Sequence, residues 1–184
     1  MSATVQEKLM TGEELLRLPD DGFRYELVKG ELIKMAPPGA WHGALAVHLG
    51  SLLNQYVRAR GLGVVTVEAG YYLARDPDTV RGPDVSFVSR ARIPAEGIPK
   101  GFWSFAPDLA VEIVSPNDTA EEVMARVSDY LRAGTRLVWV VQPATKTVTE
   151  YRSFSQVRVL TEEDTLEGGE VLPGFACPVA ELFV

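Results

Sequence analysis

The runs DLAVEIV (108–114) and LVWVV (137–141) decide the fold, because each is a strongly apolar segment of strand length. Between them, Thr119 can cap a helix whose apolar side chains recur on one face as far as residue 132. A strand, a helix and a second strand in this order predict a right-handed crossover. Since both strands are predominantly apolar, we expect other elements to cover both faces of them.

On either side of this unit the sequence predicts further helices and strands. Thr11 and Glu14 form a capping-box pattern, which predicts a short helix to about Leu18. Residues 23–35 are typical of two strands that turn at Lys29-Gly30. We also expect a helix from Trp41 to Arg60, strands within 63–75 and at 84–89, 147–153 and 156–160, an irregular excursion at 90–107, and a helical turn at 179–183. Together these elements predict one α/β domain over residues 1–184.

Composition and charge exclude several classes of protein. The 184 residues are 46% hydrophobic and 23% charged, which is enough for one sizeable core. No apolar stretch approaches the length of a membrane span, and the N-terminus has no signal-peptide core, so we expect a cytoplasmic protein without a membrane partner. The single Cys177 and the two histidines exclude an internal disulfide and a cysteine-rich or multi-histidine metal site. A net charge of −7 argues against non-specific coating of DNA.

Two acidic residues stand where a buried strand ordinarily has none. Asp84 follows a proline in RGPDVSFV (81–88), and Glu112 lies within the first apolar run. An ionised carboxylate there is costly unless a positive charge offsets it, and Mg²⁺ is the usual offset. If the strands are neighbours, both carboxylates can converge on one cation, as a nuclease requires. The alternatives are a turn aspartate at the first position and an arginine-paired glutamate at the second.

Four segments of the chain resemble the Uma-type restriction endonuclease family within the PD-(D/E)XK nuclease superfamily. They are RYELVKGELIKMAPPGAWH (24–42), RGPDVSFV (81–88), DLAVEIVSPNDTAEE (108–122) and DYLRAGTRLVWVVQPATKTV (129–148). The resemblance covers nearly the whole chain. It implies a restriction-endonuclease-like core, a mixed β-sheet flanked by helices, with an N-terminal helix and β-hairpin. It also implies that Asp84 and Glu112 are ligands of Mg²⁺ or Mn²⁺ and that DNA is the substrate.

The chain departs from the pattern of this family at three positions. The lysine of the superfamily, two positions after the glutamate, is replaced by Val114. Members of the family usually have a lysine on the following helix instead, and Arg126 stands at that position. An aspartate after the next apolar strand is replaced by Gln142. Since an arginine stays protonated, Arg126 can orient a phosphate or stabilise its charge but is a poor general base.

Five further residues are secondary candidates. His42 matches the family motif and is a catalytic candidate, although a helix-start histidine with a local hydrogen bond fits equally well. Glu26 and Glu31 match acidic positions of the motif, and we favour a conformational or salt-bridge role for both. Glu68 could be a third metal ligand or could face water. For His48, a packed or exposed position is favoured over a functional one.

The leading hypothesis is an Mg²⁺-dependent endonuclease that cleaves the DNA backbone by in-line attack of an activated water. The alternative is a nuclease-derived binding or regulatory module without turnover, which Val114, Arg126, Gln142 and the acidic surface favour. A third reading is an unrelated α/β assembly protein with structural carboxylates. A homodimer is expected, because two copies most simply make two strand cuts. The aromatic residues Phe102, Trp103 and Phe105 could form its interface or pack locally.

Overall fold

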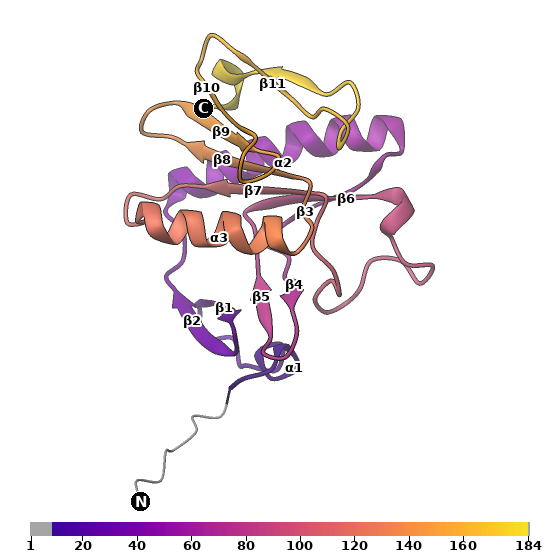
Figure 1. Ribbon diagram of the computed structural model, residues 1–184, viewed down its shortest axis with the longest axis vertical. Helices are drawn as coiled ribbons and strands as arrows, with labels where there is room; N and C mark the ends of the chain where they lie inside the picture. Colours follow the sequence, from indigo (N-terminus) through magenta and orange to yellow (C-terminus); the bar gives the residue numbers. More distant parts are fainter. Residues whose placement is uncertain (1–8, 184) are drawn as a thin grey trace, which may run out of the picture.

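Two parallel strands connected by a helix form the centre of the computed structural model, which describes residues 9–183 (Figure 1). They are β7 (Leu109–Ile113) and β8 (Leu137–Gln142), and the helix is α3 (Ala120–Arg132). The predicted crossover is therefore confirmed. Thr119 caps α3, because its side chain accepts a hydrogen bond from the backbone amide of Glu122. The side chain of Glu122 accepts one from the backbone amide of Thr119, which completes a capping box.

A six-stranded mixed sheet surrounds this pair, with the order β10-β9-β8-β7-β6-β3. The outer strands are antiparallel to their neighbours. They are β3 (Gly63–Val67), β6 (Val85–Ser89), β9 (Thr147–Tyr151) and β10 (Val157–Leu160). A separate two-stranded sheet, which the sequence did not predict, pairs β11 (Thr165–Glu167) with β12 (Ala176–Pro178) before the 3-10 turn η2 (Val179–Leu182).

Helices cover both faces of the six-stranded sheet, as the apolar strands predicted. Helix α2 (Ala40–Arg60) covers one face, where Leu109, Val111 and Ile113 of β7 enter the largest core. Helix α3 lies across the other face, on which Ala110 packs with the apolar side of that helix (Figure 1). Because strand residues alternate between the two faces, Glu112 points to the face of α3.

A second, four-stranded antiparallel sheet has the order β2-β1-β5-β4 and lies below the first in Figure 1. The N-terminal hairpin is confirmed, with positive φ angles of 51° at Lys29 and 82° at Gly30, as a tight two-residue turn requires. The sequence did not predict β5. The strands are β1 (Arg24–Val28), β2 (Glu31–Met35), β4 (Tyr71–Ala74) and β5 (Thr79–Arg81).

One expectation needs correction, and one pair of alternatives can be compared with the structure. The N-terminal helix α1 (Gly12–Leu15) has the predicted capping box but ends before Leu18. The excursion after the short 3-10 turn η1 (Arg90–Arg92) does not present its central aromatic residue to solvent. Trp103 is only 2% exposed, stacks on Tyr71 with ring centroids 6.1 Å apart, and contacts Phe105. The local-packing alternative therefore describes this segment, because the hydrophobic effect favours burying these rings.

Helix α2 confirms the prediction from leucine spacing. It ends at Gly61, whose φ of 63° is the left-handed conformation of a helix C-cap. No helix within the described residues has the combination of length and apolar character that a membrane crossing needs.

Candidate active site

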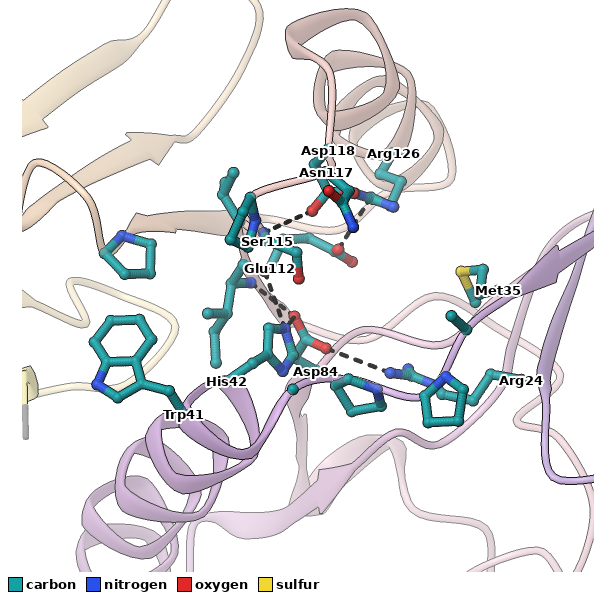
Figure 2. Close-up of a pocket in the computed structure, with 18 of the residues that line it drawn as sticks. Arg24, Met35, Trp41, His42, Asp84, Glu112, Ser115, Asn117, Asp118 and Arg126 are labelled. Atoms are coloured by element: carbon teal, nitrogen blue, oxygen red, sulfur yellow. Dashed lines mark hydrogen bonds and ion pairs between the residues drawn. The ribbon is translucent and has the colours of Figure 1, made fainter.

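The pairing of β6 with β7 brings the two predicted acidic residues together. Val85 lies opposite Val111 in this antiparallel pair. One further step of the same register places Asp84 opposite Glu112. Both residues line a cavity of about 750 Å³, in which Figure 2 shows their carboxylates side by side. The expected neighbouring strands are thus present, and the two side chains share one face.

Asp84 is held by one backbone group and two basic side chains. Its carboxylate accepts a hydrogen bond of 2.7 Å from the amide of Ile113, and the whole residue is only 6% exposed. The imidazole Nε2 of His42 lies 3.3 Å from Oδ2, and the guanidinium of Arg24 lies 3.8 Å from Oδ1. The structure therefore places His42 in direct contact with the first candidate ligand.

His42 connects the start of α2 to both strands of the site. Its Nε2 also lies 3.1 Å from the carbonyl oxygen of Ile113, while its Nδ1 is buried without a hydrogen-bond partner among the described residues. Contact with the carboxylate of Asp84 raises the pKa of His42, although burial lowers it. An imidazole in this position fixes the orientation of Asp84.

Glu112 is the more strongly perturbed of the two acids. Tyr130 on α3 donates a hydrogen bond of 2.8 Å to Oε1, and Nε of Arg126 lies 3.2 Å from Oε2 in an ion pair. Burial, and then the negative charge of Asp84, raise the pKa of Glu112 to about 8. Arg126 only partly offsets this, because its guanidinium also pairs with Asp118 at 2.6 Å.

The other predicted candidates lie around the cavity or away from it. Glu68 has a 41% exposed side chain, pairs with Arg24 at 3.1 Å, and is not part of the cavity lining. Glu31 is exposed on β2. His48 contacts the backbone carbonyl of Glu181 at 2.7 Å. Val114 and Gln142 both line the cavity.

Glu26 belongs to a buried ion network beside the cavity that the sequence did not reveal. Its carboxylate accepts bonds of 2.8 Å from the guanidinium of Arg81 and from the amide of Gly82. The same guanidinium binds Asp129 on α3. The conformational or salt-bridge role favoured for Glu26 agrees with these contacts, which hold the segment leading to Asp84.

The residues present suit a divalent cation bound by two carboxylates. No group of three or more acidic, histidine or cysteine side chains within residues 9–183 is arranged to hold a metal. Mg²⁺ nevertheless needs only one or two carboxylates, because water and phosphate complete its coordination. Burial and the negative charge of Asp84 raise the pKa of Glu112 to about 8, although Arg126 opposes this shift. A cation between Asp84 and Glu112 would offset the repulsion between the two carboxylates.

Comparisons with known proteins identify the family of the chain and its fold. The model of the Uma2 family, described as "Putative restriction endonuclease", matches residues 13–180. The crystal structure of "a putative nuclease belonging to DUF820" from Anabaena variabilis ATCC 29413 is similar, with a TM-score of 0.83 and 24% sequence identity. This match covers 95% of the present chain and 97% of the other, and it confirms the predicted fold. None of the curated proteins matches the chain.

Proposed function

Because the chain belongs to the Uma2 family, we propose that it hydrolyses phosphodiester bonds of DNA with the help of Mg²⁺ or Mn²⁺. The observation that carries this proposal is the buried pair of Asp84 and Glu112, which lie on adjacent strands at one cavity. These two carboxylates would hold the cation. When bound, it supplies Lewis-acid polarisation of the scissile phosphate and lowers the pKa of an attacking water.

The remaining residues of the site orient these carboxylates. His42 and Arg24 contact Asp84, while the hydroxyl of Tyr130 donates to Glu112. Arg126 remains protonated, so it stabilises negative charge on the phosphate rather than accepting a proton. Each of these side chains reduces the freedom of a reacting group, which contributes to catalysis by positioning.

A catalytically silent module is the second candidate, and the contacts of Arg126 favour it. The arginine that stands in place of the usual lysine is engaged with both Glu112 and Asp118. It can therefore neutralise the site without assisting turnover. A protein of this kind would keep the metal and the nucleic-acid cavity but would cut no strand.

Calorimetric titration with Mg²⁺ and Mn²⁺ tests the metal site directly. We expect binding heat for the wild type and for Glu68→Ala, and none for Asp84→Ala. Glu68→Ala is the matched control, because it removes an exposed carboxylate, on the residue after β3, that lies outside the cavity lining. Loss of the binding heat in this control would identify Glu68 as a third metal ligand. Absence of metal-dependent heat in the wild type would remove the metal-dependent nuclease.

Cleavage assays separate the active enzyme from the silent module. Incubation with plasmid DNA and Mg²⁺ is expected to give nicks that Glu112→Ala abolishes. Metal binding without nicking would favour the silent module. Arg126→Lys then tests whether the arginine prevents cleavage, because a lysine keeps the charge but cannot bind two carboxylates with one planar guanidinium group. A gain of nicking in this variant would identify Arg126 as the cause of the low activity.

We also propose that residues 1–184 fold as one domain and that two copies associate to cut both strands. Size-exclusion chromatography with light scattering measures this state. A monomer that still linearises plasmid would contradict the proposed homodimer.

A further inference from the structure

Trp41 is an exposed tryptophan at the cavity of the proposed active site. Trp41 is 48% exposed, whereas Trp103 and Trp139 are 2% and 0% exposed. Ring stacking and cation–π contacts occur at several aromatic residues of the chain, but within residues 9–183 none involves Trp41. The fold therefore gains little from this indole, since exposed apolar area adds little stability.

The position of Trp41 places an aromatic face beside the acidic pair. It precedes His42 in the first turn of α2, and the imidazole of His42 lies 3.3 Å from Asp84. In Figure 2 the indole extends away from the imidazole, on the side of the cavity opposite Arg24 and Met35. Much of the remaining lining is apolar, including Ala36, Pro37, Pro38, Val114 and Pro143. One cavity thus has an acidic centre and an aromatic, largely apolar side.

We propose that this cavity binds an unpaired nucleotide of the substrate strand, with its base stacked on Trp41 and its phosphate next to the cation that Asp84 and Glu112 would hold. This inference rests on the proposed nuclease function and specifies its substrate class. Every nucleic-acid base has a π-face, so stacking on an exposed aromatic ring accepts any sequence. A cavity of about 750 Å³ lies within the size range of sites that enclose small organic ligands.

The charges around the cavity disfavour a regular duplex. Four acidic residues line it, Glu26, Asp84, Glu112 and Asp118, against the two arginines Arg24 and Arg126. Both arginines are already paired with carboxylates. Binding to the backbone of a duplex depends on cations that neutralise many phosphates. A single unpaired nucleotide brings few phosphates and an uncharged base, which suits the aromatic side. The preferred substrates are therefore single strands, or duplexes with unpaired or everted nucleotides.

Fluorescence of Trp41 tests this proposal without any cleavage. The probe is a short oligothymidylate, titrated in EDTA into the Glu112→Gln chain, so that no strand is cut and no ionised carboxylate at position 112 repels the phosphate while the cation is absent. Since the other two tryptophans are buried, stacking should quench the emission of Trp41. An abasic strand of the same length carries the same phosphates, and a duplex of the same length has no unpaired bases. Both are expected to bind more weakly and to quench less.

Three variants in the same background define the role of the indole. Trp41→Ala is expected to abolish the quenching and to weaken binding of the oligothymidylate by about 5- to 150-fold, the usual loss for one base-stacking aromatic residue. Trp41→Phe keeps an aromatic face and should retain most of the affinity. Phe154→Ala is the matched control, because Phe154 is 57% exposed and is not part of the cavity lining. Its affinity should equal that of the parent chain.

The outcomes separate this inference from the proposed nuclease function. Stacking on Trp41 is wrong if the abasic strand or the duplex binds as tightly as the oligothymidylate. It is also wrong if Trp41→Ala binds normally or if no oligonucleotide alters the emission, even where plasmid nicking shows an active enzyme. Conversely, base-dependent quenching without metal-dependent nicking would support the nucleotide site at Trp41 and contradict the proposed nuclease activity.

Discussion

Arg81 and Asp129 connect the four-stranded sheet to the helix that covers the six-stranded one. From β5, the guanidinium of Arg81 donates to Oδ2 of Asp129 on α3, from Nε at 3.0 Å and from Nη2 at 2.7 Å. Its Nη1 donates to Glu26 on β1 at 2.8 Å. The next residue, Gly82, donates its amide to the same glutamate. One buried cation thus fixes the segment that leads into Asp84.

Replacing this arginine should strongly destabilise the protein. We expect Arg81→Met to lower the free energy of unfolding by about 3–5 kcal/mol, because it leaves the buried carboxylate of Glu26 without its charged partner. Arg58→Met is the control, since Arg58 is exposed near the end of α2 and should change stability by less than about 0.5 kcal/mol. Urea denaturation measures both. Equal stability of the two variants would show that the network is dispensable.

The acidic pair could be predicted from the sequence because each carboxylate is recognised from the residues next to it in the chain. Glu112 interrupts an apolar run of strand length, and Asp84 directly precedes another. Once β6 and β7 are neighbours, register alone places Asp84 opposite Glu112. The crossover through α3 follows from the capping residue Thr119 and from apolar spacing in the same way.

The supporting contacts could not be predicted, because their partners are distant in sequence. Arg81 meets Asp129 across 48 positions, and the strand that carries it has only three residues, too few to show a period. Tyr130 was predicted only as part of an apolar helix face, although its hydroxyl binds Glu112. Glu68 was predicted within an alternating strand, but it follows β3 with a positive φ of 55°, and it pairs with Arg24.

Asp108 should make stability depend on pH in the acidic range. Its buried carboxylate accepts a bond of 2.8 Å from the amide of Ser89 and pairs at 3.0 Å with both Arg92 and Arg136. Burial raises the pKa of Asp108, but the amide and the arginines outweigh it, so the pKa is lowered from its ordinary value of 3.8. The unfolded chain therefore binds a proton first as the pH falls. The stabilisation is complete above about pH 5 and disappears as the pH falls through the lowered pKa.

Asp108→Asn tests this linkage. At pH 7 we expect it to lose about 1–2 kcal/mol, mainly because the partly buried amide of Ser89 loses a charged acceptor, while the two partly exposed arginines contribute little. The difference from the wild type should shrink when denaturation is repeated near pH 3. A difference that stays constant with pH would mean that packing, not charge, explains the loss.

Tyr130→Phe should move the pH dependence of metal binding. The hydroxyl of Tyr130 donates to the ionised form of Glu112, and this bond lowers the pKa of the carboxyl against the larger effects of burial and of Asp84. Below pH 8 a proton competes with the cation, so affinity for Mg²⁺ should rise with pH and then level off. Removing the hydroxyl raises the pKa of Glu112 further. Calorimetry from pH 6 to 9 should show the midpoint of this rise at higher pH in the variant, and an unchanged midpoint would contradict the assignment.

Glu112→Gln should stabilise the metal-free protein while removing its response to metal. The pKa of Glu112 is about 8 in the folded chain against an ordinary value of 4.5, mainly because of burial and the charge of Asp84. The folded state thus keeps a proton that the unfolded state releases, and stability falls as the pH rises from about 4.5 through 8. At pH 7 in EDTA, the amide removes this penalty, and we expect a gain of about 1–3 kcal/mol.

Addition of Mg²⁺ should offset the difference in stability between the two proteins. A cation that binds only the folded wild type adds about 2.7 kcal/mol at a concentration of 100 times its Kd. The Gln variant lacks the second carboxylate and should gain little. Thermal unfolding at pH 7, with EDTA and then with Mg²⁺, measures both effects. If the variant is less stable than the wild type in EDTA, the pairing of Glu112 with Arg126 and Tyr130 outweighs the repulsion from Asp84, and the carboxylate pair does not need a cation.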